Sequence, residues 1–279
     1  MKREKIERLP NFVKRFGAVH GMRLGLGLTS EGTATDCDAR PHAVPGYAEP
    51  IWLRPNRSDY SIFWQTMVNR QYDLAAFPQT AELERRAQAM LAVGKVPVIV
   101  DAGANIGLSL RAFAAKYPFA HIVAVEPDVQ NMRVLEQNLM AAGGNHTAVL
   151  GGIASQSGHC RVVSFERGSA GLQTEYCDAD HPGAVRALTV EECEAMIPDG
   201  EPWIVKLDIE GAQDELFSAR TDWVGTADLI LLELDDWAFP WSGSSVNFFR
   251  ALAEHRFDYL LSEELILAFR HQENSSVYR

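Results

Sequence analysis

The segment Val96–Pro118, VPVIVDAGANIGLSLRAFAAKYP, constrains the fold of this chain more than any other. A run of β-branched residues ends on Asp101 and is followed by Gly103 and Gly107, after which apolar residues recur at helical spacing. A buried strand, a glycine turn and a helix in this order are typical of a parallel sheet. Ligands of such sheets lie outside the carboxyl ends of the strands, so the turn is a predicted ligand site.

Strands and helices continue to alternate after Pro118. Strands are predicted at residues 121–127, 147–155, 202–211 and 227–236, and helices at 128–144, 189–197, 212–220 and 244–256. Residues 160–168 are predicted to be extended and to lead into a loop through Pro182, and residues 257–269 are predicted to form a closing hairpin. Near-continuous apolar strands that alternate with helices predict an α/β, doubly wound parallel sheet with helices on both faces.

The first 90 residues lack this alternation. They are predicted to form an N-terminal extension that caps a substrate pocket, separate from a domain at residues 91–279. Residues 17–46 are predicted to form a loop because they are rich in Gly, Thr, Asp and Pro. Residues 49–55 are predicted to be a strand, and residues 58–73 a helix with Ser58 as its N-cap. The aromatic side chains of this region either line the pocket or cover the main sheet.

The N-terminus, MKREKIERLPNFVKRF, is basic and has apolar residues at the spacing of one helical face: Ile6, Leu9, Phe12, Val13 and Phe16. Such a face touches a membrane surface or, more often, packs on its own domain. The segment lacks the apolar stretch of a secretory signal. No apolar run in the chain is long enough to predict a membrane span.

The composition argues against one class of partner and predicts a cellular compartment. A formal charge of −11 argues against nucleic acid, whose phosphates require an excess of Lys and Arg. The four cysteines, Cys37, Cys160, Cys177 and Cys193, are scattered without a metal-type spacing. Reduced, structural thiols and a cytoplasmic location are therefore expected.

The glycine turn can be compared with known nucleotide-binding patterns. The dinucleotide pattern G-x-G-x-x-G fails, because Asn105 and Leu108 stand where it needs glycine, and no P-loop Lys-Ser/Thr pair follows. The spacing D-x-G-x-x-x-G suits S-adenosylmethionine, whose ammonium group can pair with Asp101. Glu126 ends the next strand, where a carboxylate can accept hydrogen bonds from both ribose hydroxyls, as in dinucleotide folds.

A second group of polar residues lies at two later strand ends. Period-two alternation predicts Lys206, Asp208 and Glu210 on one strand face, and the next strand adds Glu233, Asp235 and Asp236. Asp208 is expected beside Asp101, because the first and fourth strands are adjacent in this topology.

Three interpretations of these carboxylates are open. Asp208, Glu233 and Asp235 bind a divalent cation such as Mg²⁺ that orients substrate hydroxyls. Alternatively, one of them, best Asp208, accepts a hydroxyl proton as a general base. In the third interpretation, the carboxylates and Lys206 form a buried network that orients the cofactor.

Five segments, VIVDAGANIGLSL, VAVEPD, EQNL, WIVKLDIEGAQDELF and LILLELDDW, together resemble the FkbM-type methyltransferase family over residues 96–269. The resemblance implies a class I, Rossmann-like, seven-stranded sheet and methyl transfer from S-adenosylmethionine to a hydroxyl. It also implies a set of cofactor contacts: Asp101, Gly103, Ala104, Asn105, Gly107, Glu126 and Pro127. Many members carry a histidine close behind the glutamate that matches Glu233. Asp235 stands there in this chain, which favours carboxylate or metal assistance.

We therefore expect an S-adenosylmethionine-dependent O-methyltransferase that acts on a hydroxyl of a small molecule or glycan. The expected catalytic residues are Asp208, Glu233 and Lys206. The alternative is a protein that kept the fold and the cofactor site but lost turnover, and a nicotinamide oxidoreductase is disfavoured by the failed glycine spacing. The acceptor, a requirement for metal and assembly into a homo-oligomer are left open by the sequence.

Overall fold

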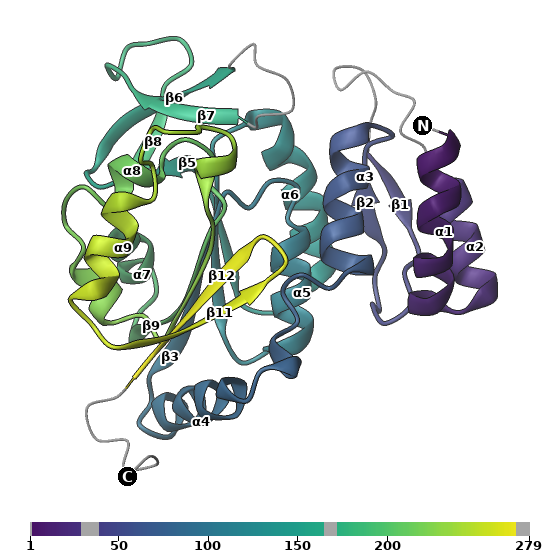
Figure 1. Cartoon of the computed structure of the whole chain (residues 1–279), viewed down its shortest axis with the longest axis horizontal. Coiled ribbons are helices and arrows are strands. Elements are labelled where there is room, and N and C mark those ends of the chain that lie inside the picture. Colours follow the sequence, from purple (N-terminus) through teal and green to yellow (C-terminus); the bar gives the residue numbers. More distant parts are fainter. Residues whose placement is uncertain (1, 29–38, 165–171, 272–279) are drawn as a thin grey trace. The chain divides into compact units, whose positions relative to one another are not determined.

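The computed structural model describes residues 2–28, 39–164 and 172–271, shown as coloured ribbon in Figure 1. The chain forms two compact units. Unit 1 comprises Met1–Asp73, Asn105–Tyr117 and Gln130–Gly144, and unit 2 comprises Leu74–Ala104, Pro118–Val129 and Asn145–Arg279. The chain therefore passes between the units several times. The boundary near residue 90 and the capping role of the N-terminal extension stay predictions.

Unit 2 is built around one sheet, which has ten strands within the described ranges. Seven of them, in spatial order, are β11 (Phe257–Ser262), β12 (Leu265–Arg270), β10 (Leu229–Glu233), β9 (Gly200–Leu207), β3 (Val96–Ala102), β4 (His121–Glu126) and β5 (His146–Ile153). The strands from β10 to β5 run parallel, whereas β12 is antiparallel to both of its neighbours. The predicted class I, Rossmann-like fold is confirmed, as is the closing hairpin formed by β11 and β12.

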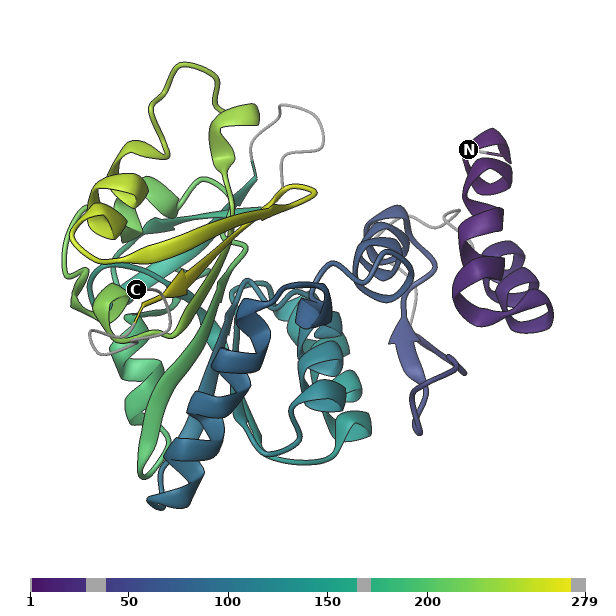
Figure 2. The same ribbon diagram turned by 60° about the horizontal axis from the view of Figure 1, so that its bottom comes forward.

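Hydrophobic packing covers both faces of this sheet. Helices α7 (Val190–Ala195), α8 (Gln213–Leu216) and α9 (Val246–Ala253), together with the 3-10 turn η3 (Asp222–Gly225), pack on one face. Helix α4 (Gln79–Ala92) lies on the other face, as Figure 2 shows, and its Leu83 carbonyl accepts a hydrogen bond from the buried Trp203 indole. Near-continuous apolar strands require this two-sided burial.

Three further strands extend the sheet beyond β5. These are β8 (Val185–Leu188), which pairs parallel with β5, then β6 (Gly158–Ser164) and β7 (Leu172–Tyr176), which pair antiparallel. The extended structure predicted at 160–168 agrees with β6 as far as Ser164, and residues 165–168 lie outside the described part. The loop predicted through Pro182 is wrong at β7 and is confirmed from Cys177 to Pro182.

Unit 1 contains helices and a small antiparallel ribbon. Its elements are α1 (Lys2–Phe16), α2 (Ala18–Gly27), β1 (Arg40–His42), β2 (Ile51–Leu53), α3 (Arg57–Phe63), the π-helical turn η1 (Trp64–Val68), α5 (Leu108–Lys116) and nearly all of α6 (Val129–Ala142). A 3-10 turn, η2 (Leu74–Ala76), opens the following segment of unit 2. The loop predicted at 17–46 is wrong at α2, where apolar residues that pack against α1 stabilise a helix, and at β1, which pairs with β2. Residues 29–38 of this predicted loop lie outside the described part of the chain.

The core of unit 1 explains the predicted amphipathic N-terminus. Phe12 and Phe16 of α1 are buried, and the Phe12 ring lies 6.2 Å from that of Phe63 and 6.4 Å from that of Tyr60. The apolar face of α1 therefore packs within its own unit, as does this part of the aromatic segment. The N-cap of α3 is Asn56 rather than the predicted Ser58, because the Asn56 side chain accepts a hydrogen bond from the Asp59 amide.

Asn138, in the EQNL segment, is fully buried in unit 1 and joins three parts of it. Its side-chain oxygen accepts a hydrogen bond from the Trp52 amide, and its nitrogen donates to the carbonyls of Trp52 and Ile106. A buried amide with these partners fixes α6 against β2 and the start of α5. No helix within the described ranges is both long enough and apolar enough to cross a membrane.

Candidate active site at the carboxyl ends of the strands

Lys206 is the centre of a buried polar cluster in unit 2, at the carboxyl ends of β3 and β9. Its side chain is 2% exposed, and its Nζ lies 3.0 Å from the Asp101 carboxylate, which is fully buried. Nζ also donates to the Gly103 carbonyl at 2.8 Å and to the Ala102 carbonyl at 3.3 Å. The ammonium group is thus occupied by the protein, and it holds the glycine turn against the end of β9.

Asp208 lies beside Asp101, as the strand order predicts. Lys206 Nζ is 3.5 Å from its carboxylate, and its amide donates to the Ala102 carbonyl. The Asp208 side chain is 41% exposed, so it faces the site while Lys206 stays buried. Strand β9 ends at Leu207, however, so the alternation predicted for residues 206–210 does not continue through Asp208 and Glu210.

Gly103 lies where any side chain would clash with the backbone of the protein. Its φ is +69°, and a Cβ at this position would lie 1.9 Å from the carbonyl oxygen of Asp208. The amides of Gly103 and Ala104 both donate to the Val125 carbonyl at the end of β4. The role of Gly103 as a cofactor contact stays a prediction, and in the structure the missing Cβ admits the backbone that follows β9.

Glu126 ends β4, next to the turn, and is 4% exposed. Its Oε1 accepts a hydrogen bond from the Asp128 amide at 2.9 Å, across Pro127. The carboxylate is therefore held inward instead of pointing into water. Asn105 and Gly107, the later residues of the glycine turn, belong to unit 1 and have φ of +51° and +80°.

Two carboxyl groups with perturbed pKa values lie at the carboxyl end of β10, Glu233 as its last residue and Asp235 just after it. Burial raises the pKa of Glu233 to about 7, with further increases from the charges of Asp208, Glu264 and Glu210. Burial likewise raises the pKa of Asp235, at the start of the 3-10 turn η4 (Asp235–Trp237), to about 7. Carboxyl groups that titrate near neutral pH are suited to proton transfer.

The segment after β9 forms hydrogen bonds with the Asp235 carboxylate and with the backbone of Glu233. The Gly211 amide donates to Asp235 Oδ2 at 2.8 Å, and the Gln213 side chain donates to the Glu233 carbonyl. These bonds bring the ends of β9 and β10 together. Across the described ranges, no three Asp, Glu, His or Cys side chains are grouped so as to hold a metal ion, so the predicted ligands Asp208, Glu233 and Asp235 do not form a ready-made site.

The β6–β7 hairpin is a neighbour of the site that was not expected from the sequence, although residues 160–168 were predicted to be extended. Its Gln173 side chain is 6% exposed and covers Gly211, where a Cβ would lie 2.5 Å from the amide carbon. Tyr176 of the same strand donates its hydroxyl to Glu215 at 3.0 Å. The hairpin thus folds back over the loop after β9, although β7 is the outermost strand beyond β5. Only the pairing of distant segments reveals this contact.

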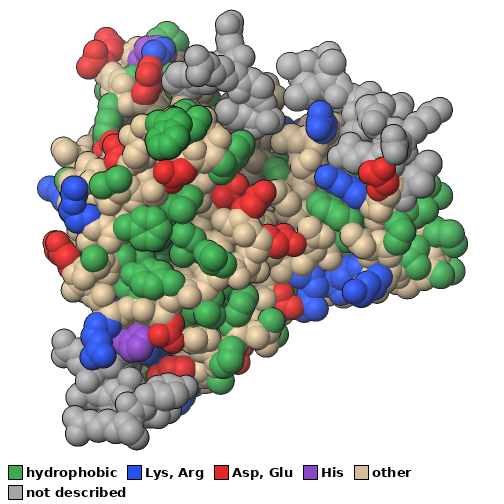
Figure 3. Space-filling view, viewed as in Figure 1, with side chains coloured by type: hydrophobic (Ala, Val, Ile, Leu, Met, Phe, Trp, Pro, Cys, Tyr) green, Lys and Arg blue, Asp and Glu red, His purple; other side chains and the backbone are tan. Residues whose placement is uncertain are grey.

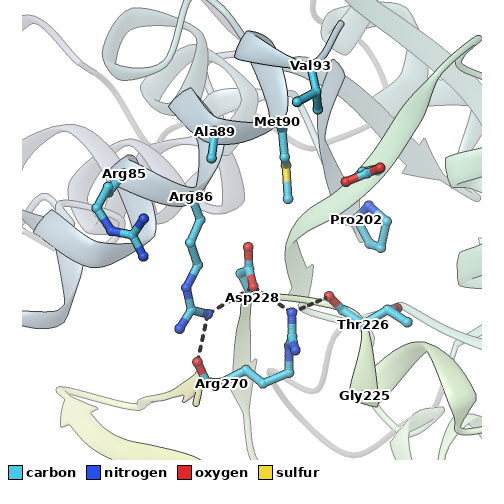
Figure 4. Close-up of a pocket in the computed structure, with 11 residues that line it drawn as sticks. Arg85, Arg86, Ala89, Met90, Val93, Pro202, Gly225, Thr226, Asp228 and Arg270 are labelled. Carbon is cyan, nitrogen blue, oxygen red and sulfur yellow. Dashed lines mark hydrogen bonds and ion pairs between the residues drawn. The ribbon is translucent and has the colours of Figure 1, made fainter. Parts of the chain in front are cut away.

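A pocket of about 580 Å³ lies at the opposite, amino end of the strands of unit 2 (Figure 4). At its base, Arg86 of α4 and Arg270 of β12 both donate to Asp228 Oδ1, at 2.9 and 2.7 Å. The Arg86 and Asp228 side chains are 8% and 2% exposed. These bonds tie α4 to β10 and β12, which is a structural role, and ligands of doubly wound sheets lie at the other end.

Comparisons with known proteins give a general likeness only. No family model matches the chain, and no curated protein matches it. It resembles the solved structure of precorrin-6y C5,15-methyltransferase from Geobacter metallireducens GS-15 at 13% identity, over 68% of this chain and 88% of that chain, with a TM-score of 0.34.

Two other solved structures are similar to the same degree. One is magnesium protoporphyrin IX methyltransferase from Synechocystis PCC 6803 with bound S-adenosylmethionine (10% identity, 68% of this chain, 79% of that chain, TM-score 0.35). The other is monomeric WbdD (15% identity, 74% of this chain, 43% of that chain, TM-score 0.39). The fold of unit 2 is established by the strand order described above.

Proposed function

We propose that this protein is an S-adenosylmethionine-dependent methyltransferase that methylates a hydroxyl oxygen of a small molecule or glycan. One juxtaposition in unit 2 supports this proposal most. The glycine turn after β3 lies between an inward-facing acid, Glu126, and two carboxyl groups with pKa values near neutrality, Glu233 and Asp235. The proposed cofactor position and the proposed proton acceptor thus lie at the carboxyl ends of neighbouring strands.

The residues at the turn fit the proposed cofactor. Glu126 is a buried carboxylate at the position where a ribose needs an acceptor, one strand away from the turn. Asp101 and Lys206 hold the turn in shape, and the remaining contacts proposed within unit 2 are Gly103, Ala104 and Pro127, whereas Asn105 and Gly107 stay predictions from the sequence. When bound, the sulfonium group of S-adenosylmethionine supplies an electrophilic methyl group.

Glu233 is the proposed general base. In its ionised form it accepts the proton of the acceptor hydroxyl, and its pKa near 7 keeps much of it ionised at neutral pH. Asp235 is held by the Gly211 amide, and Asp208 is the more exposed carboxylate, so Asp208 is placed to orient the hydroxyl. Lys206 is a positioning residue in this account, because its ammonium group is buried and occupied.

The proposal also includes transfer to oxygen, assistance by a divalent cation and a cytoplasmic location. The FkbM-type motifs support O-methylation, and Mg²⁺ assistance through Asp208, Glu233 and Asp235 requires these side chains to move together. Cys160, Cys177 and Cys193 are unpaired thiols, which supports a cytoplasmic location, while Cys37 lies outside the described residues.

The experiment that tests the proposal measures S-adenosylhomocysteine release with purified protein across a panel of hydroxyl-bearing small molecules and saccharides. Acceptor-dependent release that Glu233→Gln abolishes and Glu254→Gln leaves intact is the expected result. The same assay with and without EDTA shows whether a divalent cation is needed. Cofactor binding without turnover on any acceptor would favour the alternative of an inactive methyltransferase fold.

A further inference from the structure

Two glycines fix which side of α2 faces α1 in unit 1. A Cβ on Gly21 would lie 2.4 Å from the Phe12 carbonyl oxygen, and one on Gly25 would lie 2.8 Å from Leu9 Cδ1. The two helices therefore pack with close backbone contact along this side, and Leu24 is buried there too.

The opposite side of α2 is apolar as well. Val19 is 74% exposed, Met22 46% and Leu26 60%, and their spacing places them on one face of the helix. In Figure 3, hydrophobic side chains gather over the α1–α2 end of unit 1, and Lys and Arg side chains lie on the same face of the unit. We call Val19, Met22 and Leu26 the α2 stripe. Amphipathic surface helices normally present polar residues to water, so an exposed apolar stripe indicates an interaction surface.

Charge distinguishes this hairpin from the rest of the chain. Residues 1–28 contain seven Lys and Arg against two acidic residues, whereas the remainder contains nineteen against thirty-five. Lys14 of α1 and Arg23 of α2 are exposed, and Arg23 lies next to the stripe on the helix surface. A basic, apolar surface on an otherwise acidic protein complements an anionic surface that can also accept hydrophobic side chains.

We propose that the α1–α2 hairpin docks on an anionic lipid surface, with the α2 stripe among the acyl chains and the basic residues at the headgroups. Anionic headgroups supply the complementary charge, and the acyl boundary accepts the three apolar side chains, which a nucleic acid does not. Phe12 and Phe16 remain in the core of unit 1, so docking requires no unfolding of that core.

Vesicle co-sedimentation of the full chain tests this proposal. Vesicles of phosphatidylcholine mixed with phosphatidylserine are expected to pull down the wild-type chain, and vesicles of phosphatidylcholine alone are not. The double variant Met22→Ser, Leu26→Ser is expected to bind roughly tenfold more weakly. Its matched control is Met140→Ser, Leu261→Ser, which removes two side chains of 75% and 77% exposure elsewhere and should bind as wild type.

Charge and self-association supply the remaining readouts. Arg23→Glu is expected to weaken binding, whereas Arg250→Glu, on the exposed side of α9, is not, and circular dichroism checks that each variant is folded. Equal sedimentation with both vesicle types, or no loss in the stripe variant, would overturn the proposal. A stripe-dependent change in molecular mass in solution without lipid binding would instead assign the stripe to a second copy of the chain.

Discussion

The ammonium group of Lys206 lies 3.0 Å from the carboxylate of Asp101, and both side chains are buried beneath the glycine turn. Removing one member of such a pair leaves an uncompensated charge, which costs about 3 kcal/mol or more. We therefore expect Lys206→Met to lower the free energy of unfolding by about that amount, measured by urea denaturation.

The pairing also predicts a coupling between the two positions. The double variant Lys206→Met, Asp101→Asn removes both charges, so it should be less destabilised than Lys206→Met alone. Additive effects of the two substitutions would contradict the direct interaction. Lys95→Met, which changes a half-exposed lysine at the amino end of the same sheet, is the control and should change stability little.

Gly103→Ala tests the close approach of the turn to the backbone after β9. The added Cβ would lie 1.9 Å from the Asp208 oxygen, so the variant should lose about 3 kcal/mol of stability or more. Gly143→Ala is the matched control, because Gly143 has a similar φ of +63° and open space around its Cβ direction. It should lose only about 1 kcal/mol from backbone strain. Equal losses in the two variants would refute the contact.

The pKa of Glu233 predicts the pH dependence of methyl transfer. Burial raises this pKa to about 7, and a general base must be ionised, so kcat/KM should rise with pH and level off above about 8. Glu233→Gln should lower kcat by about 100-fold or more and abolish the rise of kcat/KM with pH. A wild-type kcat/KM that does not change between pH 5 and 8 would contradict the assignment of Glu233 as the general base.

Glu194 of α7 predicts a pH dependence of stability that is independent of catalysis. Burial raises its pKa to about 8, above the ordinary value of 4.5, with a smaller contribution from Glu191. The folded state therefore holds this proton more tightly than the unfolded state, and stability is lost as pH rises from about 4.5 through about 8.

Replacing Glu194 removes this loss at high pH. Glu194→Gln should gain about 4 kcal/mol relative to wild type between pH 5 and pH 9, since each pKa unit corresponds to about 1.4 kcal/mol and most of the interval from 4.5 to about 8 lies within this pH range. Thermal or urea unfolding at the two pH values measures the difference. The control is Glu254→Gln, which changes an exposed side chain. Its free energy of unfolding should differ from that of wild type by the same amount at both pH values.

Much of the sheet was predictable because local sequence determines it. Apolar runs such as Val98–Ala102 form strands that are buried on both faces, and the order of the β–α units sets their neighbours. Adjacent strand ends also follow from that order, which is why Asp208 was expected beside Asp101. The helix predicted at 189–197 is confirmed at α7, where Thr189 is the N-cap and forms a full capping box with Glu192.

Other features depend on contacts that sequence spacing does not encode. The β6–β7 hairpin folds back onto Gly211 through Gln173, a residue with no local pattern around it. Helix α2 forms within a glycine-rich segment because its glycines permit close packing on α1, whereas composition alone favoured a loop. Asn56 replaces Ser58 as the N-cap because its side chain accepts a hydrogen bond from the Asp59 amide, a contact that sequence spacing alone did not predict.

Isothermal titration calorimetry with S-adenosylmethionine tests most directly whether the carboxyl ends of β3 and β4 form a cofactor site. Wild type is expected to bind one molecule per chain, and Glu126→Gln about tenfold more weakly, as for the loss of a charged hydrogen bond. Glu201→Gln, at the amino-end pocket, should bind like wild type. Absence of binding, or equal affinity of wild type and Glu126→Gln, would contradict the account.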